Sequence, residues 1–476
     1  MVPGGLGRGP ECRYTSRMLG RFTPTWPDIR ALLRLALPMV AAQVGLMSLG
    51  VVDVIVVGHV SADALAGVSL GNLYVFALAV FGMGTLWALD PIVSQAMGAK
   101  DMDGVALGIQ RGLILSTLLG LGLTVLCLPA GAIFKMLRQP AEAVPGAAGF
   151  VWVSAFGMVP LLLFSTLRQS LQAMKQTRTV VLTILLGNVI NLFFNWVFVF
   201  GHLGARPGGA AGSALSSVIG RWIMLAALLY LSRHGLGPHL RPWRRQAFER
   251  APLLRTIRIG LPIGAQSSIE FIMFAVISVL AGWFGAEAIG GHQVAISLAS
   301  LTFMVPAGVG SAAAVLVGHA IGEGDLPHAR RVATSALGVA AAFMACSALV
   351  LLAMPQVFAR LYTNVPGVIA LATVLLPIAG IFQVFDGVQV VASGVLRGAG
   401  DTRAAMFANL PGFWLIGLPV SLWCGFPMHL GVVGLWWGFV AGLAAVAFFL
   451  VLRVRVTLGR HVARVRIEDT ATNVAP

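Results

Sequence analysis

Four acidic residues stand inside long apolar stretches of the sequence: Asp53, Asp90, Glu270 and Asp386. A charged side chain at the centre of a membrane span costs about 2.5–3.5 kcal/mol on insertion scales, so such residues normally face the interior of a helix bundle. Interior carboxylates are typical of sites that take up and release a proton or a small cation. We therefore consider Asp53, Glu270 and Asp386 the candidate cation-coupling residues.

Asp90 differs from the other three acids in its surroundings. It precedes Pro91 and lies ten residues before Lys100, close to the end of its apolar stretch. A structural cap or a gate is the better interpretation of this residue.

Three asparagines recur along one predicted span. Asn188, Asn191 and Asn195 recur at i, i+3 and i+7, which places them on one face of a helix. Their oxygens could bind a cation, but amides in spans also join helices by hydrogen bonds worth about 0.6–2 kcal/mol. The spacing leaves both roles open.

Three glutamines are further supporting candidates. Gln383 and Gln389 lie three residues before and after Asp386, on the same helical face. Gln293, beside His292, is a polar position of lower weight. We expect the face around Asp386 to be polar and turned inward.

The elements that must position these residues are membrane spans. Only 10% of the 476 residues are charged, against about 25% in soluble domains, and 58% are hydrophobic. A span needs about 20 mainly apolar residues. Alternating strands are excluded because 64–89 contains no charge. The chain supplies twelve helical spans, at Leu33–Val57, Ala64–Ala88, Val105–Ile133, Gly146–Gln169, Thr179–Gly201, Gly209–Leu231, Thr256–Phe284, Ala288–Val317, Val332–Met354, Gly367–Val391, Ala404–Trp423 and Leu430–Leu452.

The basic residues fall on one side of these spans. Of 32 Lys and Arg, 27 lie in the termini and even-numbered turns, four lie on the opposite side, and Arg221 is inside a span. The positive-inside rule then places both termini in the cytoplasm. Nucleic-acid binding is not expected despite the net charge of +15, because no aromatic residues interleave the arginines. The four cysteines show no paired spacing, which argues against disulfides and a zinc site.

The chain repeats itself once. An offset of 224 brings Leu37-Pro38 over Leu261-Pro262, and Asp101 over Asp325. Each half has six spans, so it starts and ends on the same side of the membrane and the two repeats are parallel. We expect a central cavity between two lobes, and movement of one lobe against the other would open the cavity to each side in turn. We expect a cytoplasmic tail at 1–32, an N-lobe at 33–232, an Arg-rich linker at 233–255, a C-lobe at 256–455 and a second cytoplasmic tail at 456–476.

Short motifs in both halves resemble the multidrug and toxic compound extrusion family. In the first half they are Gly50-Val51-Val52-Asp53 and Pro91-Ile92-Val93-Ser94-Gln95-Ala96. In the second half, Gly291-His292-Gln293-Val294-Ala295 and Phe385-Asp386-Gly387-Val388-Gln389 are similar to its NorM-type branch. The resemblance runs in order from about Leu33 to Leu452.

The resemblance implies an all-α membrane protein with twelve helices in two pseudo-symmetric lobes around a central cavity. It implies that Asp53 is the N-lobe carboxylate, with Asn191 and Asn195 near it, and that Glu270 and Asp386 form the C-lobe cation pair, where Na⁺ could bind. One departure is Phe382, which stands where NorM-type members often have Tyr; Gln383 or water could replace the absent hydroxyl.

The leading hypothesis is a secondary active antiporter that exports amphipathic, often cationic, organic compounds in exchange for Na⁺ or H⁺. A flippase for a lipid-linked precursor is the alternative, although only Arg221 lies within the spans to hold a pyrophosphate. An enzyme is not expected, since Asp101-Met102-Asp103 sits in a loop. We expect no cofactor, contacts with membrane lipids, a monomer, and a place in the bacterial inner membrane.

Overall fold

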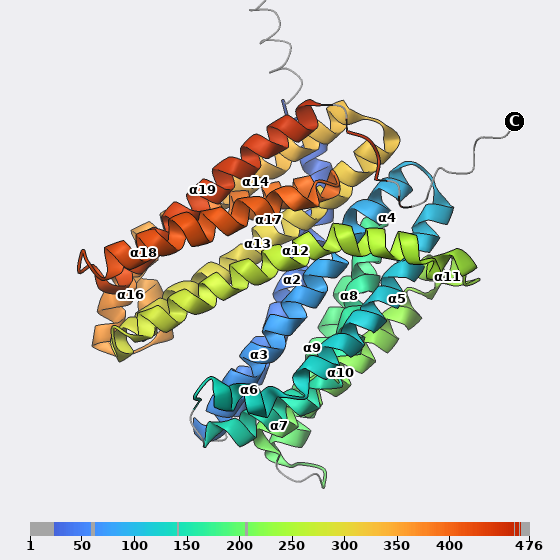
Figure 1. Ribbon diagram of the computed structural model, residues 1–476. Coiled ribbons are helices and arrows are strands. Elements are labelled where there is room, and N and C mark those ends of the chain that lie inside the picture. Colours follow the sequence, from blue (N-terminus) through green and yellow to red (C-terminus); the bar gives the residue numbers. More distant parts are fainter. Residues whose placement is uncertain are drawn as a thin grey trace, which may run out of the picture.

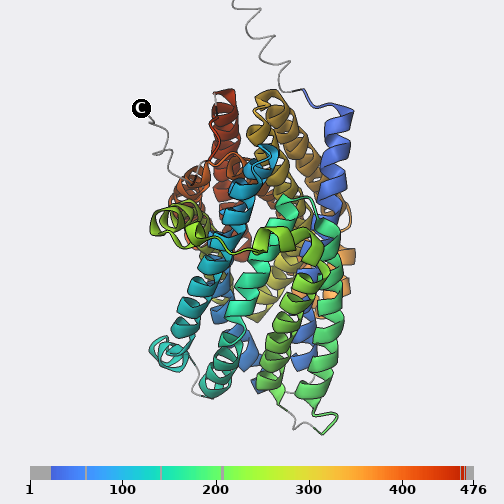
Figure 2. The same ribbon diagram turned by 90° about the vertical axis from the view of Figure 1, so that its right-hand side faces the viewer.

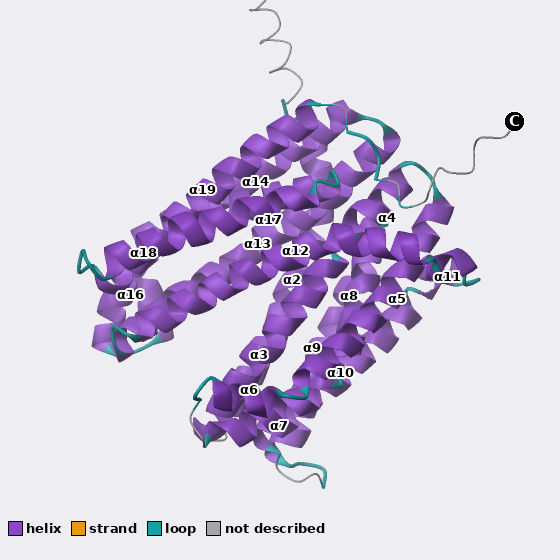
Figure 3. Cartoon of the chain, in the orientation of Figure 1, coloured by secondary structure: helices purple, strands orange, loops and turns teal. Residues whose placement is uncertain are grey.

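The computed structural model describes residues 23–58, 62–139, 142–204, 208–460, 462–465 and 467. These residues form helices and loops, and no strand occurs among them (Figure 3). The fold expected from the sequence is confirmed. Within the described ranges, eleven helices are long and apolar enough to cross a membrane, and the number is twelve when a pair bent by 50° is counted as one span. Most of the expected N-terminal tail, and the end of the C-terminal one, lie outside the described residues.

The described residues of the N-terminal half form nine helices. They are α2 (Trp26–Gly58), α3 (Ala62–Leu86), α4 (Leu89–Gly98), α5 (Met102–Cys127), α6 (Ala130–Met136), α7 (Ala143–Ala155), α8 (Met158–Ala173), α9 (Thr177–Phe200) and α10 (Gly209–Leu231). The bent pair is α7 and α8. Short α11 (Arg233–Leu240) and the 3-10 turn η1 (Arg245–Phe248) form the linker, which lies against α5 (Figure 2).

The C-terminal half follows the same plan. Its elements are α12 (Arg250–Gly282), α13 (Ala286–Glu323), α14 (Leu326–Ala353), α15 (Pro355–Tyr362), α16 (Pro366–Gly398), α17 (Thr402–Pro411), the π-helical turn η2 (Gly412–Gly417), α18 (Leu418–Gly425) and α19 (Gly431–Gly459). Several helices extend beyond the apolar stretches that predicted them; α2, for example, begins seven residues before Leu33.

The internal repeat is visible in the helix bounds. α2 and α12 each have 33 residues and start 224 positions apart, and α5 and α14 start at the same offset. Asp101 and Asp325 cap these last two helices: their Oδ1 atoms accept hydrogen bonds from the backbone N–H of Gly104 (2.8 Å) and His328 (2.9 Å). Such a cap satisfies a donor that the first helical turn leaves free.

The helices gather into two bundles that diverge toward the lower left of Figure 1. The first helix of each half packs against the other half as well as its own. The beginning of α2 joins the core of the C-terminal bundle through Leu32, Leu35 and Met39, and α12 packs closely along α3. Because each of them packs against the opposite bundle, α2 and α12 connect the two bundles.

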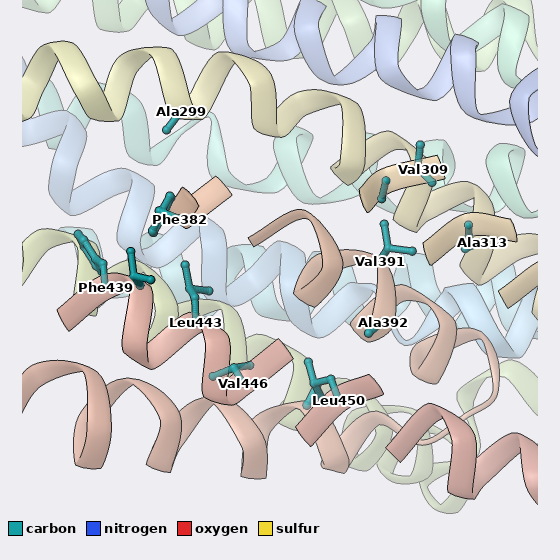
Figure 4. Close-up of a cluster of buried hydrophobic side chains, with 14 of the residues drawn as sticks. Ala299, Val309, Ala313, Phe382, Val391, Ala392, Phe439, Leu443, Val446 and Leu450 are labelled. Carbon is teal, nitrogen blue, oxygen red and sulfur yellow. The ribbon is translucent and has the colours of Figure 1, made fainter. Parts of the chain in front are cut away.

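The C-terminal bundle has an extended apolar core between α13, α16 and α19 (Figure 4). Phe382, Trp436 and Phe439 form its aromatic part, with ring centroids 5.5 Å apart between Phe382 and each of the other two. All three side chains are fully buried. This packing fixes the rotation of α16, which carries Asp386.

Candidate cation sites

The Asp53 site joins three helices of the N-terminal bundle. Asp53 on α2 accepts hydrogen bonds at Oδ1 from the side-chain amides of Asn191 (3.1 Å) and Asn195 (2.7 Å) on α9. Its Oδ2 accepts one from the Ser217 hydroxyl on α10, also at 2.7 Å. Both asparagines are buried. Asp53 is therefore a carboxylate surrounded by hydrogen-bond donors.

Arg221 supplies a positive charge near this site. It lies one turn after Ser217 on α10, and its charge acts on Asp53. Its guanidinium sits at the bend between α7 and α8, where Nη1 is 2.9 Å from the position that a Cβ on Gly157 would take. Nη1 is buried and has no hydrogen-bond partner among the described residues. Arg221 thus acts on Asp53 as a buried counter-charge.

Two predicted supporting residues lie apart from the acids. The Asn188 amide donates to the backbone carbonyls of Gly45 and Ile184, each at 2.9 Å, and so ties α9 to α2. Gln293 is exposed, and its amide donates to Ser297 one turn along α13 (3.4 Å). Of the two roles that the asparagine spacing left open, the structure gives Asn188 the structural one.

Glu270 and Asp386 come together in the C-terminal bundle. Glu270 on α12 is close enough to act electrostatically on Asp386 of α16, which is buried. Glu270 Oε2 accepts long hydrogen bonds from Gln389 (3.5 Å) and from Asn409 of α17 (3.4 Å). Gln389 lies one turn after Asp386 on the same helix, so its bond to Glu270 brings α12 against this part of α16.

Three oxygen atoms around this pair are left without donors. Asp386 Oδ1, Gln389 Oε1 and Asn409 Oδ1 are buried and have no hydrogen-bond partner in the structure. A buried polar group left unsatisfied costs about 1–3 kcal/mol. No group of three or more His, Cys, Asp or Glu that could hold a metal ion occurs in the described part of the chain. The donor set is instead two carboxylates and two amides, oxygen ligands of the kind that hard cations prefer.

Phe382 and Gln383, both considered beside Asp386, are used for packing. Phe382 points into the aromatic core shown in Figure 4 and is 1% exposed. Gln383 accepts a hydrogen bond from Thr302 of α13 (2.7 Å) and donates one to Ser347 of α14 (3.0 Å). Since both ends of its amide are engaged, Gln383 does not replace the hydroxyl that Phe382 lacks.

Asp90 forms a buried ion pair between the bundles. Its Oδ2 is 2.9 Å from Nε of Arg397 at the end of α16, with side-chain exposures of 5% and 10%. Arg397 also lies over the Trp87 ring, 4.8 Å from its centroid. The expectation that Arg221 is the only basic residue within the spans was wrong. Arg111, Arg168 and Arg397, which were counted with the turns, are buried within α5, α8 and α16.

Close backbone contacts accompany this ion pair. A Cβ on Gly98 of α4 would lie 2.1 Å from the His319 carbonyl oxygen of α13, and one on Gly322 would lie 2.2 Å from that of Gln95. Only glycine permits helices to approach this closely. Gln95 donates to the Gly398 carbonyl (2.8 Å), and His319 Nε2 is 2.7 Å from the Ala173 carbonyl. The bundles are therefore joined at the end that carries the linker, which we call the linker face.

Sequence reasoning missed Ser217 and Asn409. Each is a polar residue within a predicted span, and Asn409 has no periodic partner that would mark a polar helix face. The one available signal was position: Ser217 stands one turn before Arg221, and Asn409 is the single amide in 404–423.

Comparisons with known proteins place this chain among membrane transporters. The MatE family model matches residues 38–197 and 262–423, one stretch in each half. The chain is 33% identical over 439 residues to the multidrug resistance protein MdtK of Edwardsiella ictaluri, covering 90% of this chain and 96% of that protein. It is 33% identical over 443 residues to the multidrug resistance protein NorM of Vibrio parahaemolyticus, covering 90% and 95%.

Solved structures with the same fold include the eukaryotic MATE transporter AtDTX14, with a TM-score of 0.82 and 22% identity over 90% of this chain and 95% of that one. Another is an outward-facing multidrug resistance MATE transporter of the MOP superfamily, with a TM-score of 0.79 and 20% identity over 91% and 96%.

Proposed function

This chain belongs to the MatE family of multidrug efflux transporters, and from that premise we propose that it exports amphipathic, often cationic, organic compounds in exchange for Na⁺ or H⁺. The proposed coupling to an ion rests on one observation: buried oxygen atoms around Glu270 and Asp386 have no hydrogen-bond donor among the described residues. Such groups persist in a bundle interior when they mark an ion pathway.

The C-lobe site fits Na⁺ as cargo. Asp386 Oδ1, Gln389 Oε1 and Asn409 Oδ1 are free acceptors, and Glu270 adds a second carboxylate. A hard cation would satisfy all of them at once, because it accepts oxygen ligands from carboxylates and amides alike. A proton would satisfy fewer, since it can be shared by only two oxygens.

The N-lobe site fits H⁺ better. Asp53 already receives three hydrogen bonds from donors, and the Arg221 charge lies nearby. A metal cation there would meet N–H and O–H groups instead of oxygen lone pairs. A protonated Asp53 needs one acceptor, and Asn195 Oδ1 is buried without a partner. Rotation of that amide would provide it.

The proposed cycle moves the lobes at 33–232 and 256–455 relative to each other, as in other transporters built from repeats. The positive-inside rule supports a linker face in the cytoplasm, with both termini there. The bacterial relatives support a place in the inner membrane. With that orientation, the joining of the bundles at the linker face and their divergence away from it (Figure 1) support an outward-facing arrangement.

Efflux from proteoliposomes under an imposed Na⁺ gradient and, separately, an imposed pH gradient tests this function. A fluorescent organic cation serves as the substrate. Asp386→Asn should abolish efflux driven by the Na⁺ gradient, because it removes a charged ligand. Gln293→Ala is the control, since Gln293 lies outside both sites, and it should retain efflux. Full Na⁺-driven efflux by Asp386→Asn would refute the proposed coupling role.

A further inference from the structure

Residues 462–465 and 467 follow α19 across the linker face and contact both bundles. Because α19 belongs to the C-terminal bundle, this stretch, which we call the C-terminal strap, reaches from that bundle to α4 and α5 of the other. Its contacts are not explained by the two cation sites, which lie on other elements.

Backbone and side-chain hydrogen bonds hold the strap at Gln95. The Val465 backbone N–H donates to Gln95 Oε1 at 2.7 Å, while Gln95 Nε2 donates to the Gly398 carbonyl at 2.8 Å. The Gln95 side chain is fully buried. Both the oxygen and the nitrogen of the Gln95 side-chain amide, in the N-terminal bundle, are therefore hydrogen-bonded to backbone groups of the C-terminal half.

A charged contact fixes the strap one residue earlier. Arg464 Nη2 lies 2.6 Å from Asp101 Oδ2, and the other oxygen of Asp101 caps α5 through Gly104. Burial alone would raise the pKa of Asp101. The hydrogen bonds from Gly104 and Arg464 and the arginine charge outweigh it, and the pKa lies below its ordinary value of 3.8. Asp101 is thus ionised at neutral pH and available to Arg464.

Apolar packing completes the contact. Ile467 is 8% exposed and packs in a small cluster with Ala88 and Ile92 of the N-terminal half. Its carbonyl accepts a hydrogen bond from Arg255 of α12 at 2.8 Å. The strap thus contacts α4, the cap of α5 and α12 within a few residues.

We propose that the C-terminal strap is a clamp on the transport cycle, with Gln95, Arg464 and Val465 as positioning residues that hold the two bundles together at the linker face. Opening of this face requires the strap to leave Gln95 and Asp101, so the strap sets how often the outward-facing arrangement converts to the inward-facing one. This inference rests on the proposed function for its place in the cycle, but its contacts stand independently.

Spin-label distances across the linker face test the clamp. Labels are attached to Arg178→Cys and Arg403→Cys, which are exposed repeat-related positions in the two halves, after the four native cysteines are replaced by alanine. Val465→Pro removes the N–H that binds Gln95, whereas the matched Val465→Ala keeps it. We expect the long-distance population in Val465→Pro to be at least threefold that in Val465→Ala.

Truncation after Arg460 should enlarge the same population further. Equal distance distributions in Val465→Pro and Val465→Ala would overturn the clamp, and this comparison holds even if the truncated chain does not fold. Efflux assays on the same proteins separate the two claims. If the distances differ between Val465→Pro and Val465→Ala but no ion gradient drives efflux, the proposed function is contradicted and the clamp is not. If efflux is normal but the distances are equal, the clamp is contradicted and the proposed function is not.

Discussion

At the scale of single residues, the buried acids differ in what surrounds them. Asp53 receives hydrogen bonds from two amides and a hydroxyl. Glu270 and Asp386 instead share their environment with amide oxygens that have no donor. On these contacts rests our proposal that Asp53 takes up a proton and that the Glu270 and Asp386 pair takes up a metal cation. A carboxylate can have either role in this proposal, because the donors or acceptors around it decide whether a proton or a metal cation fits the site.

Substitutions at the asparagines of α9 separate coupling from packing. Asn195→Ala removes a hydrogen bond to a charged group, worth about 1.5–3 kcal/mol, so we expect pH-driven efflux to fall about tenfold. Asn188→Ala removes a tie between α2 and α9 and should lower stability by about 1 kcal/mol while efflux stays within twofold. Efflux and thermal unfolding of both variants provide the check. Equal efflux losses would contradict the distinction.

At the scale of helices, the linker face depends on a buried charge pair. Asp90→Asn leaves Arg397 buried without its partner, and breaking one side of such a pair costs about 3–5 kcal/mol. We expect a clear fall in melting temperature in detergent. The double variant Asp90→Leu with Arg397→Met should regain most of it, because apolar residues can replace a buried pair. A double variant less stable than Asp90→Asn would argue against this account of the pair.

Much of the helical framework follows from the sequence, because long apolar runs and the 224-residue offset specify both the spans and their pairing. The ends of the helices were harder to predict from the sequence. Arg397 was placed in a loop because hydropathy cannot tell a solvated turn from a helix end buried between bundles. The offset also gives no sign that α2 packs its first half in the opposite bundle.

The candidate sites were predicted unevenly for a related reason. Asp53 with Asn191 and Asn195 follows from helical periodicity and the resemblance. Ser217 and Asn409 could not be found, because each reaches its acid from another helix and only tertiary packing brings them together. Gln383 shares a helical face with Asp386, yet bonds to Thr302 and Ser347 instead.

At the scale of the whole molecule, the two bundles have their acids at different repeat positions. Asp53 corresponds to Ile277 at the 224-residue offset, and Glu270 corresponds to Leu46. The halves are therefore alike in backbone but different in chemistry. α2 carries Asp53 and α12 carries Glu270, and both helices contact the opposite bundle. Binding at either site is positioned to influence how the bundles pack together.

Counter-ion movement driven by substrate tests the exchange most directly. Proteoliposomes loaded with an organic cation are diluted into substrate-free buffer, and internal pH and Na⁺ are followed with trapped dyes. In the proposed exchange an ion enters through Asp53 or through the Glu270 and Asp386 pair, so wild type should take up H⁺ or Na⁺ as substrate leaves. The triple variant Asp53→Asn, Glu270→Gln, Asp386→Asn should show neither. Substrate-driven ion uptake that persists in the triple variant would contradict the account.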